Sequence, residues 1–392
     1  LDQDKDGQTT CAGDCDDQDP QNVLGNPEIC GDARDNNCSN TADEGCGGLG
    51  TFVSTQTGND NNPGTQALPV ASIKEGMAHA VQLGAPRTVY IAGGNYFEKV
   101  ILVERISLEG GSQCSFASCS WARDPVAHRT SIRAQDEEGL LAPATITKAT
   151  RLDGLRIVGQ TGGSSSGYGR RAITLDGGTP TITNNRIEGA NVSGNSTRTV
   201  ALSILAPSVD QGGALIDGNT IIGGDSSETS LGIEMRHKSW PPPNPAVATI
   251  TGNTIRGGDA PRTRAIAAWV SGPGTLIEDN TITAGSSSDT GGSWGIEIGG
   301  TATINANRIN LDRSQVGVCA GASTLCGGIA SESSTSRITN NVVIGPRGPM
   351  TTALLLSERE VPAGTVVVNG NYLDGGGSQF SAVATTTAAI VI

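Results

Sequence analysis

A seven-residue pattern of alternating polar and aliphatic positions recurs along the chain from residue 151 onward. It reads Thr-Ile-Thr-Asn-Asn-Arg-Ile in the segment 181–187, and related copies follow at intervals of 27 to 34 residues. Seven copies carry asparagine at the fifth position: Asn185, Asn219, Asn253, Asn280, Asn307, Asn341 and Asn371. An eighth copy, at 151–157, has Leu155 there. Repeats with one fixed core and a variable remainder are typical of solenoids.

A second alternating segment precedes most copies, as at 172–175, 232–235 and 295–298. Period-two alternation predicts strands with aliphatic side chains inside and polar side chains outside. The asparagine lies between two such segments, where we expect it to sit at a bend and to tolerate a positive φ. Its amide can bond the equivalent asparagine one coil away, so the column can satisfy itself without water.

These repeats resemble the parallel β-helix repeat of the pectate-lyase-like superfamily, and the stacked asparagines resemble the asparagine ladder of right-handed parallel β-helices. The resemblance implies an all-β fold, a right-handed parallel β-helix solenoid whose coils and loop insertions occupy residues 113–392.

Residues 49–112 resemble the start of secreted bacterial β-helix proteins, and part of this region has helical periodicity. Ile73, Met77 and Ala80 fall on one helical face, and Ser72 suits the N-cap position. We therefore predict an amphipathic helix over about 72–84 that caps the N-terminal end of the coil stack. An uncovered end would pair with other strands.

Composition and charge exclude two classes of protein. The 392 residues carry a net charge of −13, and no basic stripe of the kind that nucleic acid requires is present. No stretch approaches the length of a membrane-spanning apolar helix. The charge is concentrated in residues 1–48, where ten Asp and two Glu face only Lys5 and Arg34.

The acidic segment 1–48 has the features of a metal-binding module. Asp2, Asp4 and Asp6 alternate before Gly7, a spacing that lets side chains converge on one cation. Over about 45 residues the segment resembles the acidic, Cys-containing metal-binding module of bacterial surface proteins that is named for MopE. It contains no His, Met or Trp, so its hard carboxylate oxygens favour Ca²⁺ over copper. The expected ligands are Asp2, Asp4, Asp6, Asp14, Asp16, Asp17, Asp19, Glu28, Asp35, Asp43 and Glu44.

Nine clustered cysteines indicate disulfides and an extracellular or cell-surface location. Five of them lie in the acidic module, at Cys11, Cys15, Cys30, Cys38 and Cys46. Because five is an odd number, one is free or pairs with a segment outside this sequence. The other four predict two local, loop-closing disulfides, Cys114–Cys119 and Cys319–Cys326. The chain begins at Leu1 without an initiator Met, so we expect any signal peptide or lipid anchor to have been removed.

Candidates for catalysis are few. Polysaccharide-cleaving enzymes of the resembling fold use paired carboxylates, or calcium with an Arg or Lys base. No recurring pair of Asp on adjacent outward positions is visible, and packing explains Trp269 and Trp294. The best lyase-like patch is a basic group on consecutive coils, for which a solvated loop is the competing interpretation: Arg236, His237, Lys238, Trp240, Arg262 and Arg264.

We therefore expect a non-catalytic, calcium-stabilised structural or adhesive protein. The segment Gly375–Ile392 is uncharged and β-prone, which favours end-to-end association into a homo-oligomer or extracellular filament, unless it folds over its own last coil. A surface glycan is a further expected partner. The alternative is a polysaccharide lyase or glycoside hydrolase of the β-helix type.

Overall fold

A computed structural model describes most of the chain from Gly50 onward and a few positions before it. The described residues are 8–9, 15–16, 22–24, 26, 35, 37–39, 50–116, 119–160, 169–192, 198–206, 212–237, 244–287, 292–311, 326–332, 335–345, 351–356, 366–374 and 382–384. They belong to two compact units: unit 1 spans 1–96 and 106–130, and unit 2 spans 97–105 and 131–392. The three-part division at residues 48 and 112 stays a prediction.

Unit 1 contains the one helix among the described residues, and its position confirms the predicted amphipathic segment. Helix α1 spans Ile73–Leu83, and the Ser72 side chain accepts a hydrogen bond from the backbone N–H of Glu75 at 3.2 Å. Its buried face packs on the parallel strands β1, β2 and β5, and β6 pairs with β5 in the antiparallel direction. The strands of unit 1 are β1 (Gly50–Val53), β2 (Arg87–Ala92), β3 (Gly94–Tyr96), β5 (Ile106–Cys114) and β6 (Cys119–Arg123).

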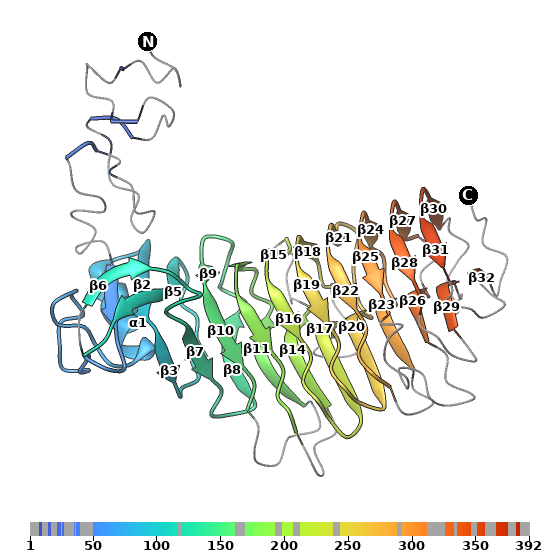
Figure 1. Ribbon diagram of the computed structural model, residues 1–392, viewed down its shortest axis with the longest axis horizontal. Coiled ribbons are helices and arrows are strands. Elements are labelled where there is room, and N and C mark those ends of the chain that lie inside the picture. The colour runs from blue at the N-terminus through green and yellow to red at the C-terminus, as the bar shows by residue number, and fades with distance from the viewer. Residues whose placement is uncertain are drawn as a thin grey trace. The chain divides into compact units, whose positions relative to one another are not determined.

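Unit 2 is a parallel β-solenoid in which each complete coil contributes one strand to each of three sheets (Figure 1). The first sheet contains β9 (Arg151–Asp153), β12 (Thr181–Thr183), β15 (Ala214–Asp217), β18 (Ala248–Thr251), β21 (Leu276–Glu278), β24 (Thr303–Asn305), β27 (Arg337–Thr339) and β30 (Val367–Asn369). The second contains β7 (Thr130–Arg133), β10 (Leu155–Val158), β13 (Arg186–Glu188), β16 (Thr220–Ile222), β19 (Thr254–Arg256), β22 (Thr281–Thr283), β25 (Arg308–Asn310), β28 (Val342–Ile344) and β31 (Tyr372–Asp374). The third contains β4 (Val100–Ile101), β8 (Glu138–Pro143), β11 (Arg170–Asp176), β14 (Arg198–Leu205), β17 (Thr229–Arg236), β20 (Arg262–Ala268), β23 (Ser293–Ile298), β26 (Cys326–Ser331), β29 (Thr351–Leu356) and β32 (Ala382–Ala384).

The core of the solenoid consists of aliphatic columns held in register by the parallel pairing. In the first sheet Ile182 pairs with Ile216, and Ile216 with Ile250, and all three are fully buried. Equivalent columns run through the other two sheets. Because each buried aliphatic side chain contributes about 1.5–3 kcal/mol, the columns supply much of the stability.

The seven predicted asparagines form an unbroken ladder along the first bend of the coils. The Nδ2 of each donates to the Oδ1 of the next, from Asn185 to Asn371, at 2.9–3.2 Å. At the first rung the backbone N–H of Leu155 donates to Oδ1 of Asn185 at 2.9 Å. The prediction of an all-β, parallel β-solenoid is thus confirmed.

One detail of the predicted bend is wrong: the asparagines do not take the positive φ. The residue before each rung does, as at Asn184 (55°), Asp279 (53°) and Ala306 (54°). Glycine fills this position at 154, 218, 252 and 370. The left-handed residue turns the chain, and this turn aims the following asparagine along the solenoid axis.

The described part of the C-terminal tail adds a strand to its own chain. Strand β32 pairs in parallel with β29, with Ala382 opposite Leu354. The rest of the segment 375–392 lies outside the described residues, so the structure does not test end-to-end association. In the part of the chain that the structure describes, no helix is long and apolar enough to cross a membrane.

Candidate functional site

One outward face of the third sheet combines burial with charge. Register places Thr174, Ser203, Glu234, Ala267 and Glu297 in one column, offset by one residue from the inward aliphatic column. The first three are at most 1% exposed, although outward side chains of a solenoid are expected to meet solvent. A buried polar column outside the core is therefore the first sign of a site.

Glu234, on β17, is fully buried and has three polar neighbours. Arg198 donates to its Oε1 through Nη2, and Ser203 Oγ donates to its Oε2 at 3.2 Å. Nε of Arg236 lies 3.1 Å from the same Oε1. A buried carboxylate without partners costs several kcal/mol, so the two guanidinium groups make this position possible.

Glu297 lies two strands further along the same column and is bound in a similar way. Nε of Arg264 is 2.6 Å from its Oε2, and Trp269 Nε1 donates to the same oxygen at 3.1 Å. The Arg198 guanidinium carbon lies 5.3 Å from the centroid of the Trp269 ring, which is a cation–π contact. Arg198 and Trp269 therefore join the two carboxylates into one network.

Four arginines meet on this face; Arg171, Arg198, Arg236 and Arg264 are called the arginine cluster below. Arg171 is 4% exposed, and its Nη1 lies 3.6 Å from Glu138 Oε1. Burial lowers the pKa of Arg171, and the positive charge of Arg236 lowers it further. Burial also lowers the pKa of Arg198, although Glu234 opposes this. Four guanidinium groups thus face three carboxylates, Glu138, Glu234 and Glu297, in a poorly solvated place, and the one positive charge in excess favours an anionic ligand.

One titratable imidazole directly follows a member of the cluster in the sequence. His237 directly follows Arg236 at the end of β17 and is half-buried. Burial lowers the pKa of His237 below 6.5, so the neutral imidazole predominates at neutral pH. A neutral imidazole can accept a proton, whereas guanidinium groups can hold an anion.

The patch expected from the sequence is only partly assembled among the described residues. Arg236 and Arg264 both enter the network, through Glu234 and Glu297 respectively. Arg262 is exposed, and its backbone N–H donates to the carbonyl of Glu228 at 2.8 Å. Lys238 and Trp240 lie outside the described residues.

Sequence reasoning missed five members of the network: Arg171, Arg198, Glu234, Trp269 and Glu297. A signal for two of them was present, because Gly-Ile-Glu occurs at both 232–234 and 295–297, in strands that take the same register. The expected carboxylate pair was two Asp on adjacent coils, whereas the structure has two Glu, Glu234 and Glu297, with one coil between them. Trp269, explained from the sequence by packing alone, also donates a hydrogen bond.

The acidic module is described at few positions. Cys15 and Cys38 form a disulfide, and Asp35 Oδ1 accepts a hydrogen bond from the Ser39 N–H at 2.8 Å. Of the expected metal ligands only Asp16 and Asp35 are described, and the other nine lie outside the described residues. Among the positions that are described, no three His, Cys, Asp or Glu side chains gather as a metal would require.

The predicted local disulfide between Cys114 and Cys119 is present. Cys326 is also disulfide-bonded, but Cys319 lies outside the described residues, so the pairing of these two stays a prediction.

Comparison with known proteins identifies the acidic module. The family model Cu-binding_MopE, described as "Putative metal-binding motif", matches residues 14–44. No curated protein matches the sequence.

Several solved structures share the fold at low sequence identity. A tailspike protein of Acinetobacter baumannii bacteriophage Fri1, titled a capsular polysaccharide depolymerase, is 10% identical with a TM-score of 0.38, and the match covers 86% of this chain and 62% of the tailspike. The GH136 lacto-N-biosidase from Eubacterium ramulus is 12% identical with a TM-score of 0.35, covering 87% and 67%. The catalytic domain of a GH87 alpha-1,3-glucanase is 13% identical with a TM-score of 0.32, covering 82% and 67%.

The expectation of a non-catalytic structural or adhesive protein is corrected by these findings. The three matched structures are named for proteins that degrade carbohydrates. The chain is a parallel β-solenoid that carries a MopE-type metal-binding motif at residues 14–44.

Proposed function

We propose that this protein is a polysaccharide lyase that cleaves uronate-containing chains by β-elimination at the arginine cluster. The observation that carries the proposal is the meeting of four arginines on one face of the third sheet, with His237 directly after Arg236 in the chain. The reaction needs a cation to neutralise the uronate carboxylate and a base to remove the proton from the adjacent carbon.

The arginine cluster suits the first requirement. Guanidinium groups bind carboxylates through paired hydrogen bonds, and neutralising the uronate makes its neighbouring C–H more acidic. The buried Glu234 receives Arg198 and contacts Arg236, so it holds both side chains in place before substrate arrives. Glu234 is thus a positioning residue.

His237 suits the second requirement. Its lowered pKa keeps the imidazole neutral at neutral pH, the form that can take the proton. The electron pair of the broken C–H bond then forms a carbon–carbon double bond, and the glycosidic C–O bond breaks. The leaving oxygen takes a proton from water, so charge and atoms balance.

Hydrolysis by Glu234 and Glu297 is less well supported. Hydrolysis by two carboxylates needs a defined separation of their carboxyl groups, and one strand lies between these two residues, so their Cα atoms are roughly 9–10 Å apart. Hydrolysis also needs one carboxylic acid that carries a proton. Both carboxylates instead accept hydrogen bonds from guanidinium groups, so they already serve as partners of the arginine cluster.

The test is ultraviolet absorbance of unsaturated products from a panel of uronate polymers, such as polygalacturonate, alginate and heparosan. We expect His237→Gln to lower kcat about 10²- to 10⁴-fold, with His128→Gln as the matched control. Arg236→Ala should raise KM and lower kcat, whereas Arg308→Ala on the second sheet should do neither. The rate should fall only when the pH drops below the lowered pKa of His237. Absence of unsaturated product from every polymer, or full activity of His237→Gln, refutes the proposal.

For the MopE-type motif we propose Ca²⁺ as the metal. The disulfide between Cys15 and Cys38 ties the acidic run around Asp16 to the one around Asp35. Residues 1–48 offer twelve carboxylates and no His or Met, a donor set that fits a hard cation and gives copper no imidazole or thioether ligand. Calorimetric titration of the demetallated chain should show Ca²⁺ binding in preference to Cu²⁺. Preferential binding of Cu²⁺ would contradict this assignment.

An extracellular or cell-surface location fits both proposals. Cys15, Cys38, Cys114, Cys119 and Cys326 are all disulfide-bonded, and such bonds persist in oxidising compartments. Acidic surface glycans are the substrates that a lyase would meet there. Fractionation of the native host should recover the protein outside the cytoplasm.

A further inference from the structure

Unit 1 contains a cavity of about 340 Å³ that the proposed lyase site does not use. Six residues line it: Thr57, Gln66, Ala67, Pro69, Cys119 and Trp121. The volume lies within the range of small-molecule sites. None of the six side chains is charged, so the cavity differs in chemistry from the arginine cluster.

Trp121 forms a rigid aromatic wall of this cavity. Its Nε1 donates to the carbonyl of Gln66 at 3.1 Å, and its ring meets Phe52 edge to face with centroids 4.8 Å apart. Phe52 in turn stacks on Tyr90 at 5.1 Å. Trp121 has a φ of +59°, which is unfavourable for a bulky side chain. Strand β6 therefore holds the indole in place at a conformational cost.

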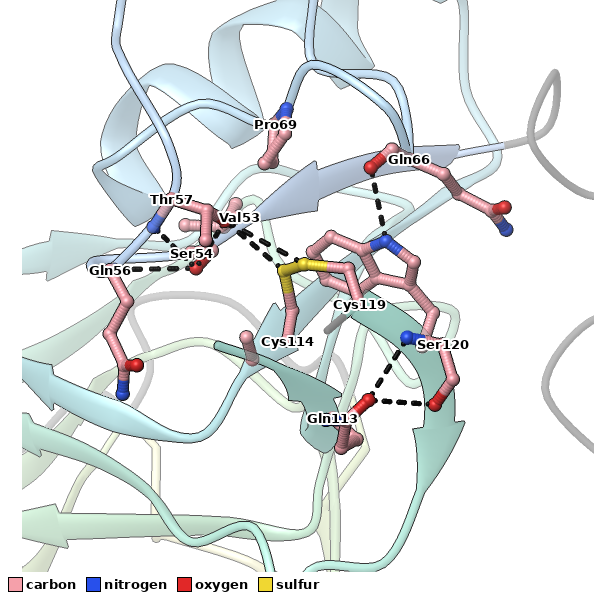
Figure 2. Close-up of a disulfide and its surroundings, with 12 residues drawn as sticks. Val53, Ser54, Gln56, Thr57, Gln66, Pro69, Gln113, Cys114, Cys119 and Ser120 are labelled. Carbon is pink, nitrogen blue, oxygen red and sulfur yellow. Dashed lines mark hydrogen bonds between the residues drawn. A yellow bond between two sulfur atoms is a disulfide. The ribbon is translucent and has the colours of Figure 1, made fainter. Parts of the chain in front are cut away.

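The disulfide between Cys114 and Cys119 lies at the same cavity, which Cys119 lines (Figure 2). Thr57 Oγ1 lies 3.1 Å from Cys114 Sγ and 3.0 Å from Ser54 Oγ. Beside it, Gln113 Oε1 accepts hydrogen bonds from the N–H and hydroxyl of Ser120, at 3.0 and 2.8 Å. The β5–β6 hairpin is thus covalently closed and hydrogen-bonded next to the cavity. Ligand binding therefore costs little conformational entropy there.

We propose that this cavity binds a neutral sugar residue, with Trp121 as its stacking platform. A sugar ring presents C–H groups to an aromatic face and hydroxyl groups to its surroundings, where Thr57 and Gln66 supply polar atoms. A charged ligand would lose hydration without meeting an opposite charge. An aliphatic ligand would displace water from the polar groups of the cavity without giving them new hydrogen bonds. The site recognises neutral glycan independently of the uronate-binding cluster.

The test is isothermal titration of the full chain with three neutral tetrasaccharides: cellotetraose, laminaritetraose and tetra-N-acetylchitotetraose. We expect at least one to bind the wild type, and Trp121→Ala to bind it at least about tenfold more weakly. Trp121→Phe should keep part of the affinity. His237→Gln should bind as the wild type does, which separates this site from the proposed lyase activity.

A second pair of variants keeps the test valid if Trp121→Ala does not fold. Ala67→Arg places a long side chain at an exposed position of the cavity wall and should abolish binding, whereas Ala122→Arg, an exposed neighbour outside the lining, should not. Unchanged binding by Ala67→Arg, or no binding of any of the three sugars to the wild type, overturns the proposal.

Discussion

Replacing Asn253, in the middle of the ladder, by alanine should destabilise the solenoid by about 3–5 kcal/mol. Its Oδ1 accepts from the N–H and Nδ2 of Asn219 at 2.8 and 3.0 Å. Its Nδ2 donates to the carbonyls of Ile216 and Thr251, at 2.9 and 2.7 Å, and to Oδ1 of Asn280 at 3.0 Å. Truncation removes all five contacts at a site that is 1% exposed.

The magnitude follows from what each partner loses. The Nδ2 of Asn219 keeps two other acceptors, and the Thr251 carbonyl keeps the N–H of Gly218. The N–H of Asn219 loses its acceptor and remains buried, which costs about 1–3 kcal/mol. The lost net contributions of the other bonds bring the total into the stated range.

Urea denaturation followed by circular dichroism measures the loss, and native-state hydrogen exchange locates it. The Asn219 amide should lose protection, whereas the Asn280 amide, which donates to Asn307, should keep it. Asn371→Ala, at the half-buried last rung, is the matched control and should cost clearly less. Equal losses for the two variants, or an Asn219 amide that stays protected, would refute the reasoning.

Three further predictions concern other parts of the fold. Ala306→Gly should stabilise the chain by about 1 kcal/mol in thermal denaturation, because Ala306 is exposed and takes a φ of 54° that glycine adopts without strain; no gain would contradict the strain argument. Burial raises the pKa of Glu188, but hydrogen bonds from Arg156 and Arg186 lower it overall. The folding stability that this carboxylate contributes is therefore lost as the pH falls through the lowered pKa. The melting temperature of Glu188→Gln should therefore fall less than that of the wild type between about pH 5 and pH 3, and equal falls would argue against it. Chelation should expose residues 1–48 to protease, since so acidic a segment needs cations to fold; unchanged resistance would count against a metal-stabilised module.

The solenoid could be predicted from the sequence because its coils repeat one local rule. Each rung needs asparagine and each inward position needs an aliphatic side chain. Residues that stack on one another in the structure are therefore the residues that align when the repeats are compared. The bend was less accessible, since Asn184, Asp279 and Ala306 share a backbone conformation but no side-chain type. In the sequence, only the glycines directly before some of the rungs indicate a residue with positive φ.

The candidate site could not be predicted to the same degree because it forms between coils. Arg198 reaches Glu234 across 36 residues, and Arg264 reaches Glu297 across 33. Which outward column is buried depends on what lies over the sheet, and no local period encodes this. The basic residues were visible, but their carboxylate partners were recognisable only once the register was known.

The ladder also separates the length of a coil from its geometry. Successive rungs are 34 residues apart from Asn185 to Asn253, 27 apart from there to Asn307, and then 34 and 30 apart up to Asn371. Each Nδ2–Oδ1 distance nevertheless stays within 2.9–3.2 Å. Additional residues therefore lie in loops outside the strands and the ladder, and lengthening a loop costs little conformational entropy. In such a scaffold, the loop that contacts a substrate can change in sequence and length in one coil at a time, while the stability of the repeated core stays the same.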